Sequence, residues 1–415
     1  MHLSIMGIVL ILFCEVAAAQ QNDIAANSQP GRVVAQAAIR PGDPIVGDPF
    51  SQAASNGSGV PTPGQEGSTK TKKPNTGKTQ TKISHMPTIV DTRVGYIDGA
   101  IIGSQVRIRF DAAFGDSASD RAEFFYAQYN GITGNGPGPK FVVADLNFQQ
   151  LYLNAEYAPK KNKRFSFFAE VPERWIQPQR TIASTTSIAS TPTPLPNVNE
   201  AGLSDVAAGL KLAAVASSNQ YLTFQFKAFF PSGNASRGLG TNHYNFEPAL
   251  LYYRKFSDRL ALEAQLGDSH PIGGSTCQAI VPTSAYPGAV CVATPVPMKY
   301  SPPQLSGSSS SFAGDVLFYG VGPSYVLYQG RTVQIAPVIE LVGWTVLGGL
   351  VTDNATANTG FQDAVSANGI NIVTLKVGAR TSIGKHNSFY IGGGYAVTHS
   401  LWYKDILRVE YRYSF

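Results

Sequence analysis

The chain has 415 residues and a formal net charge of +5. Charged residues make up 14% of it, well below the roughly 25% of ordinary soluble proteins, yet hydrophobic residues reach only 43%. A bundle of transmembrane helices is excluded, because no apolar run after residue 13 reaches the roughly 18 residues that a helix needs to span a bilayer. The modest charge gives no indication of nucleic-acid binding.

Residues 1–19 have the pattern of a cleaved secretory signal. An apolar stretch covers residues 5–13, and alanines occupy positions 17–19, where a signal peptidase requires small side chains. We therefore predict that the mature chain begins at Gln20.

Export through an oxidising compartment also affects the expected state of the cysteines. Cys277 and Cys291 remain after the signal is removed, and an oxidising route favours a disulfide between them. Two free thiols are the alternative.

Residues 20–88 are predicted to be a disordered tail. They contain no Tyr or Trp and a single Phe, while Pro and Gly recur throughout, so they cannot bury enough apolar surface to fold. Residues 67–82 carry five lysines and no acid. This run is either a contact for anionic lipid or cell-wall polymer or a solvated linker.

The remainder, residues 89–415, shows period-2 alternation in segments of about ten residues, the length with which a tilted strand crosses a membrane. In the first segment, Val106 and Ile108 alternate with Arg107 and Arg109. Such a charged face can line a water-filled barrel whose other face meets lipid. Thirteen segments follow the pattern: 104–114, 121–129, 147–157, 164–171, 204–216, 220–230, 244–256, 259–267, 315–328, 331–345, 370–383, 388–397 and 404–415.

Short connections alternate with long ones along this series, as expected where short turns face the periplasm and long loops face outside. In this orientation the last segment and residues 104–114 both run toward the periplasm, so one earlier crossing is needed. Residues 89–101 supply it, which predicts an antiparallel transmembrane β-barrel of about fourteen strands. If residues 89–101 instead thread through the lumen as a plug, or if one strand has been split, twelve strands is the alternative.

The chain's last nine residues, LRVEYRYSF, resemble the C-terminal signal of bacterial outer-membrane barrel proteins, with Tyr411, Tyr413 and Phe415 carrying the likeness. Residues 106–128 resemble the first hairpin of such proteins, and the overall plan is similar to transporters of fatty acids and aromatic hydrocarbons. The resemblance implies a bacterial outer-membrane location with the tail in the periplasm. It also implies membrane lipid and the barrel-assembly machinery as partners.

The polar faces of the segments supply candidate residues for solute selection in the lumen. Barrel closure brings the last segment beside the first, so their arginines should gather and favour anions. Alternatively, arginines and carboxylates on neighbouring strands are mutual partners that stiffen the interior. The candidates are Arg107, Arg109, Asp111, Arg121, Glu123, Arg380, Arg408, Glu410 and Arg412.

Aromatic residues gather at both ends of the predicted strands, as they do at the two interfaces of a bilayer. We predict that Trp175, Trp344 and Trp402 anchor the outer interface.

Catalytic patterns are weak. Asp268 and His270 are similar to one half of the site in outer-membrane aspartyl-type proteases, but the closely spaced Asp pair that forms the other half is missing from the sequence. Metalloprotease, serine-hydrolase and P-loop motifs do not occur. We expect no enzyme activity, no cofactor and no metal.

The expected function is an outer-membrane channel for small solutes that leans toward anions. One alternative is a transporter of hydrophobic or aromatic compounds, which requires a plugged lumen and an apolar groove near the outer loops. Another is a surface adhesin or structural barrel, which requires a lumen filled with side chains.

Overall fold

The computed structural model of the protein describes residues 92–129, 136–140, 142–159, 164–182, 198–278, 309–352 and 364–415. The predicted signal peptide and the Lys-rich tail lie outside these residues and stay predictions. The disulfide also stays a prediction, because Cys291 lies outside them.

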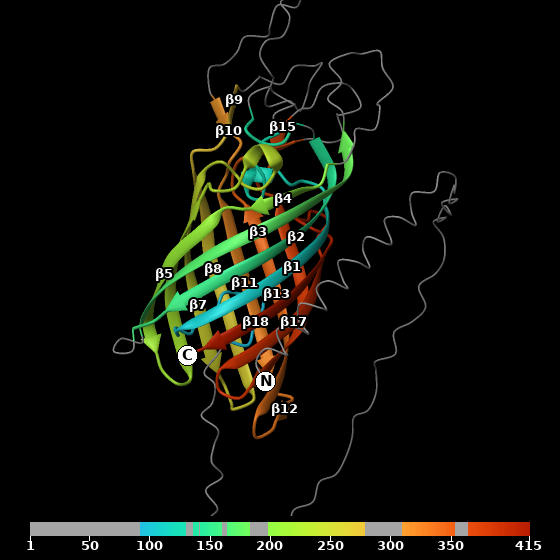
Figure 1. Ribbon diagram of the computed structural model, residues 1–415. Coiled ribbons are helices and arrows are strands. Elements are labelled where there is room, and N and C mark those ends of the chain that lie inside the picture. The colour runs from blue at the N-terminus through green and yellow to red at the C-terminus, as the bar shows by residue number, and fades with distance from the viewer. Residues whose placement is uncertain are drawn as a thin grey trace, which may run out of the picture. The chain divides into compact units, whose positions relative to one another are not determined.

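The described residues form a closed antiparallel β-barrel (Figure 1). Neighbouring strands pair in chain order, and β18 returns to pair with β1 from Ser414 opposite Gln105 to Asp405 opposite Phe114. The ring strands are β1 (Gln105–Asp116), β2 (Val142–Tyr157), β3 (Phe165–Ile182), β5 (Val206–Ala216), β6 (Gln220–Phe230), β7 (Tyr244–Lys255), β8 (Leu260–Ile272), β11 (Val316–Tyr325), β13 (Val333–Val346), β16 (Asn371–Ile383), β17 (Asn387–Ala396) and β18 (Asp405–Ser414).

Twelve strands therefore close the ring within the described residues. The sheet counts fourteen, but β4 (Glu200–Leu203) pairs only with β3 and β12 (Tyr328–Gln329) pairs only with β13, which leaves twelve. The predicted antiparallel barrel is confirmed. Its ring has twelve strands, the number that the sequence offered as the alternative to fourteen.

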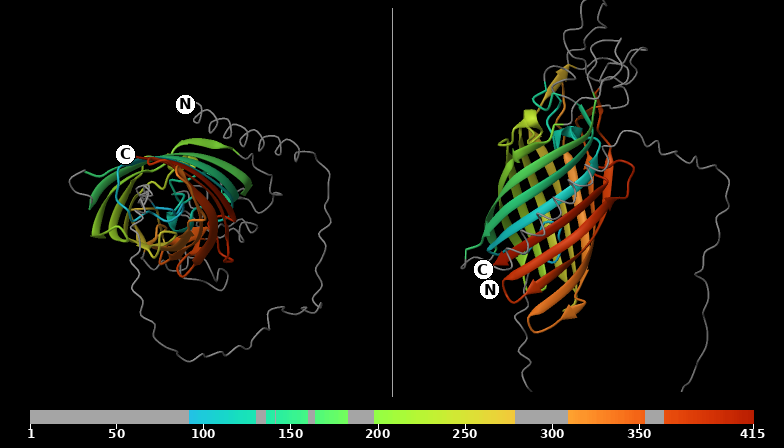
Figure 2. Two further views of the ribbon diagram at one scale, coloured as in Figure 1. Left: turned by 90° about the horizontal axis from the view of Figure 1, so that it is seen from below. Right: turned by 45° about the vertical axis from the view of Figure 1, so that its right-hand side comes forward.

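Two predicted crossings are not strands. Residues 121–129 begin with a single 3-10 turn, η1 (Arg121–Glu123), in which Ala122 and Glu123 have φ of 51° and 49°, a left-handed conformation foreign to a strand. Residues 92–101 lie inside the ring, where Figure 2 shows them in cyan from below. This is the plug that the sequence offered as an alternative.

Without these crossings the direction of the first strand reverses. β1 begins at the end of the barrel where β18 finishes, so residues 104–114 run away from that end and not toward it. We call this end, where β2–β3, β5–β6, β7–β8, β11–β13 and β16–β17 are joined by short connections, the turn end. The opposite end carries the longer connections and is the loop end.

Short elements lie at the loop end, several of them labelled in Figure 1. They comprise the strand pairs β9 (Thr276–Gln278) with β10 (Ser309–Ser311) and β14 (Leu350–Thr352) with β15 (Ala364–Ser366), and the 3-10 turn η2 (Ala235–Arg237).

The outer face of the ring is apolar and the inner face is polar. On β16, for example, Val377 is 52% exposed, whereas Lys376 and Arg380, on the opposite face of the same strand, are buried. Exposed large apolar residues recur on the other ring strands, including Leu153, Phe167, Leu212, Leu250, Leu266, Ile339 and Ile391. An apolar surface of this extent is stable against lipid rather than water.

None of the described helical elements has the length and apolar character needed to cross a membrane.

The apolar exterior yields a depth-dependent prediction. Val377→Arg, at the middle of β16, should lower the free energy of unfolding by about 2–4 kcal/mol in lipid bilayers, because it places a charge at mid-bilayer depth. Leu327→Arg, in the exposed connection at the turn end, should cost no more than about 1 kcal/mol. Urea unfolding of both variants in vesicles measures the difference. Equal losses would contradict a membrane-spanning outer face.

Candidate functional site

Ion pairs line the interior of the barrel. Arg408 binds both carboxylate oxygens of Asp111, with its Nε and Nη2 atoms each at 2.7 Å. Glu410 Oε1 lies between Arg380 and Arg412 and accepts hydrogen bonds from them at 2.9 and 2.8 Å. All five side chains face the lumen and are largely buried.

The first strand joins this network, as its predicted closeness to the last strand requires. Arg107 and Arg109 lie 3.6 and 3.7 Å from the two oxygens of Glu170, and Arg109 lies 3.5 Å from Asp111. The register places Arg107 opposite Arg412. The arginines are thus brought together as expected, but each has a carboxylate partner, which favours the reading as mutual partners.

Residues 92–103, the inner segment, lie inside the ring and are bound through their backbone. The carboxylate of Glu340, on β13, accepts hydrogen bonds from the N–H groups of Gly95, Tyr96 and Ile97 at 3.0, 2.9 and 2.9 Å. Hydrogen bonds to an ionised carboxylate are about twice as strong as neutral ones. One buried side chain therefore satisfies three consecutive backbone donors.

Other ring residues hold the same segment. Glu263 accepts the N–H of Arg93 at 2.8 Å. Arg380 donates to the carbonyl oxygen of Arg93 at 3.1 Å, and Arg408 donates to that of Gly95 at 2.6 Å. Predicted selectivity residues thus hold the inner segment in place as well as pairing with carboxylates.

The inner segment fits closely at one glycine. A Cβ atom at Gly95 would lie 2.1 Å from the Cζ atom of Tyr390, well inside van der Waals contact. Apolar side chains of the inner segment also pack at two places within the described residues: Val94 and Ile97 cluster with Val338 and Val342, and Ala100 and Ile101 belong to a cluster that includes Leu251 and Phe318. Polar and apolar contacts therefore both bind the inner segment.

Residues 117–129 cover the loop end of the lumen and are named the cap. Glu123 is fully buried there, and its carboxylate accepts the N–H of Ser275 at 2.9 Å. Arg121 donates to the carbonyl oxygen of Leu401 at 3.0 Å. These two predicted lumen residues therefore hold loops together and do not project from a strand into a pore.

A cavity of about 310 Å³, the chamber, touches both the inner segment and the cap. Its volume is at the lower limit of small-molecule sites. Its aromatic lining residues are Tyr96, Phe124, Phe125, Phe148, Tyr152, Phe229, Phe318, Trp344 and Tyr403. Its charged lining residues are Asp98, Arg109, Asp111, Glu170, Arg174, Asp205, Lys227, Glu247, Lys376 and Arg408.

Two of the predicted interface tryptophans lie elsewhere. Trp344 faces inward and lines the chamber, and Trp402 is 5% exposed and stacks on Phe124 at a centroid distance of 5.0 Å. They pack loop-end structure, so the anchor prediction is wrong for them. Trp175 alternates with the buried Arg174 and Ile176, which leaves it on the outer face, and its anchoring role stays a prediction.

The residues of the predicted assembly signal follow the outer face of β18. Tyr413 and Phe415 stack at a centroid distance of 6.4 Å, and Phe415 is 65% exposed at the turn end. Tyr411 packs on Phe389 of the neighbouring strand. Their recognition by assembly machinery stays a prediction.

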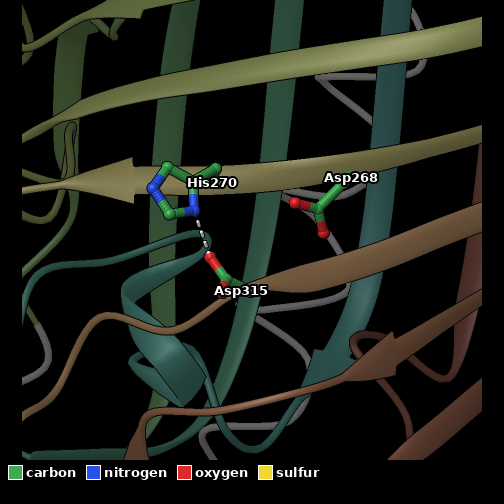
Figure 3. Close-up of side chains that lie close together, drawn as sticks. All are labelled: Asp268, His270 and Asp315. Carbon is green, nitrogen blue, oxygen red and sulfur yellow. Dashed lines mark hydrogen bonds and ion pairs between the residues drawn. The ribbon is translucent and has the colours of Figure 1, made fainter.

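Asp268 and His270 meet a third group at the loop end of the barrel (Figure 3). His270 Nδ1 lies 2.6 Å from Asp315 Oδ1, and one ligand atom of each of the three residues falls within 4.8 Å of the others. They could together hold a divalent cation. His270 is more than half exposed and is already hydrogen-bonded to Asp315, and exposed groups of this kind are common in proteins that bind no metal.

Four residues of the site lie outside the nine selectivity candidates. Alternation places Glu263, Glu340 and Lys376 on polar strand faces, and only Arg174 was not indicated by the sequence. In the structure, Glu340 and Lys376 stand opposite each other in the register of β13 and β16. Pairing between them is the natural expectation. The inner segment occupies Glu340 instead, and only its placement in the lumen shows this.

No protein-family model and no curated protein matches the chain. Among solved structures, the chain is similar to an outer-membrane channel from Pseudomonas putida F1, with 11% identity, a TM-score of 0.44, and coverage of 78% of this chain and 100% of that one. It is also similar to the NanC porin, with 9% identity, a TM-score of 0.36, and coverage of 75% and 100%. The translocator domain of the autotransporter NalP from Neisseria meningitidis has 11% identity, a TM-score of 0.36, and coverage of 77% and 90%. These likenesses are confined to the fold.

The binding of the inner segment can be tested by proteolysis. In the folded protein trypsin should not cleave after Arg93, which is buried. Replacing Glu340 and Glu263 by alanine removes the acceptors of several backbone N–H groups. Cleavage after Arg93 should then become at least about tenfold faster, because a loss of about 1.4 kcal/mol in the binding free energy of the inner segment raises its unbound fraction about tenfold. Mass spectrometry of the new N-terminus at Val94 measures it. Glu173→Ala, on the outer face, is the control and should leave Arg93 protected.

The cap carries a pH-sensitive carboxyl. Burial raises the pKa of Asp120 to about 6, although Thr352 donates hydrogen bonds to it. Because this pKa is above the unfolded value of 3.8, the folded state retains the proton longer, and stability falls as pH rises from about 4 to 6.

Asp120→Asn should remove this loss. Relative to the wild type, the variant should gain about 2.4 kcal/mol in free energy of unfolding between pH 4 and pH 7. Urea unfolding of both proteins across this range measures the difference. A difference independent of pH would show that Asp120 ionises normally.

Proposed function

We propose that the protein is a channel of the bacterial outer membrane that passes small solutes, and that the inner segment closes it at rest. The observation that supports this is how the ring holds the inner segment inside the lumen. Ring side chains bind the inner segment through ionic and backbone hydrogen bonds, and a chamber remains beside it. Water can replace such contacts when the segment withdraws.

The connection of the inner segment suggests how withdrawal occurs. Residue 103 is followed almost directly by β1, which begins at Gln105 at the turn end. The segment is therefore tethered at the turn end, and displacement toward that side would empty the lumen without breaking the strand ladder. In the proposed orientation the turn end faces the periplasm, where the predicted tail lies.

The proposed charge preference is for anions, as the arginine-rich lumen led us to expect. The five lumen arginines on β1, β16 and β18 have carboxylate partners, so they balance charge rather than attract solute. The preference would come instead from cations that face the chamber without a carboxylate partner.

A transporter of hydrophobic or aromatic compounds is the second candidate, and one observation favours it. The lumen is plugged, and aromatic rings from both the inner segment and the cap line the chamber. Both functions require the inner segment to move, and they differ in whether ions pass with the solute. A purely structural barrel would not require the chamber.

Planar-bilayer recording tests the channel. The wild type should open rarely, whereas the Glu263→Ala, Glu340→Ala double variant should show at least about tenfold higher open probability, because it loses charge-assisted hydrogen bonds of about 1.5–3 kcal/mol each. The reversal potential in a KCl gradient should indicate anion preference. Glu173→Ala should behave as the wild type. A folded double variant that never conducts would refute the channel and leave the second candidate.

A further inference from the structure

The chamber contains two buried cations without a carboxylate partner. Lys376 and Arg174 are 3% and 7% exposed and both line it. Within the described part of the chain, neither forms an ion pair with a carboxylate, and their acceptors are the Tyr403 hydroxyl and the Phe125 carbonyl oxygen. An uncompensated buried charge is unfavourable, so such groups normally have a partner.

Lys376 is held by aromatic groups. Its Nζ atom donates to the hydroxyl of Tyr403 at 2.9 Å and lies 3.9 Å from the ring centroid of Tyr96 and 5.3 Å from that of Trp344. A phenol oxygen is a single acceptor, whereas an ammonium has three donors. Cation–π contacts stabilise the charge but do not neutralise it.

Arg174 has a comparable environment on another wall of the chamber. It donates to the carbonyl oxygen of Phe125 at 3.0 Å and lies 3.9 Å from the centroid of that ring. Its Nε atom is buried and has no hydrogen-bond partner. Both cations therefore retain donor capacity beside an aromatic surface.

The carboxylates of the chamber are already engaged. Lys227 lies 3.3 and 3.8 Å from Asp98 and Glu247, and Asp111 and Glu170 bind the arginines described above. Asp205 accepts hydrogen bonds from Gly233 and Thr241. A cationic ligand would find no free carboxylate among these lining residues, whereas an anionic ligand would find two cations.

We propose that the chamber binds a small aromatic carboxylate, with its carboxylate at Lys376 and its ring against Trp344 and the neighbouring aromatic lining of the chamber. The cavity of about 310 Å³ accommodates a single ring with a short substituent. Arg174 supplies a second cation on a different wall. This assignment deepens the proposed function by naming the solute class, and it rests on that function only for the direction of transport.

Isothermal titration of the full-length folded protein with four probes separates the chemical contributions. Benzoate carries ring and anion, acetate the anion alone, benzyl alcohol the ring alone, and benzylamine the ring with the opposite charge. Benzoate should bind saturably and at least about tenfold more tightly than the other three, as expected for a charge-assisted contact in a buried site.

Lys376→Gln should weaken benzoate binding by about tenfold or more and leave benzyl alcohol binding unchanged. Lys404→Gln, which alters an exposed lysine near the start of β18, is the matched control and should bind benzoate as the wild type does. Equal binding of benzoate and benzylamine, or unchanged benzoate binding in Lys376→Gln, would overturn the proposal.

A second measurement does not depend on the folding of the lysine variant. A bromobenzoate, which quenches fluorescence on contact, should quench the wild type saturably, and Trp344→Phe should abolish the saturable part. Quenching that persists in Trp344→Phe would place the probe elsewhere. Benzoate binding without any conductance would refute the channel but keep the chamber assignment, and conductance without benzoate binding would do the reverse.

Discussion

The binding of the inner segment by Glu340 and Glu263 is the interaction on which the interior depends. Two carboxylates from separate strands accept backbone N–H groups that no strand partner could satisfy. This fixes residues 92–103 in the lumen and forms one wall of the chamber. It also leaves Lys376 without Glu340 as an ion-pair partner, although the two stand opposite each other in the strand register. A single set of hydrogen bonds thus determines both the closed state and the charge of the chamber.

The barrel itself could be predicted from the sequence, because lipid outside and water inside impose a strict period of two. The number of strands could not, for a physical reason. Residues 92–101 mix apolar, glycine and polar residues as an irregular strand does, and only long-range contacts with β8, β13 and β16 place them inside. Residues 121–129 alternate too, but their aromatic side chains pack against loop-end clusters and the backbone turns at Ala122 and Glu123.

The candidate site could likewise be predicted only in part from the sequence. The inward positions of Arg107, Arg109, Arg380, Arg408 and Arg412 followed from alternation, and their closeness followed from closure. Their partners did not follow, since a partner depends on register between strands distant in sequence and on the inner segment. For the tryptophans, a position near a strand end does not define contact with the interface, because Trp344 and Trp402 face inward.

An ionic plug suits a gate better than an apolar one. Buried ion pairs are often no more stabilising than apolar packing of the same volume, because desolvation opposes their attraction. The balance changes when the segment leaves. An apolar plug would expose its contacts to water at roughly 25 cal/mol per Å², whereas charged groups regain their hydration. A lumen in which Glu340, Arg380 and Arg408 bind backbone therefore holds the closed state through directional contacts and keeps the free energy of opening low. The apolar contacts of Val94 and Ile97 and of Ala100 and Ile101 are the part that water cannot replace, so they set the lower limit of that free energy.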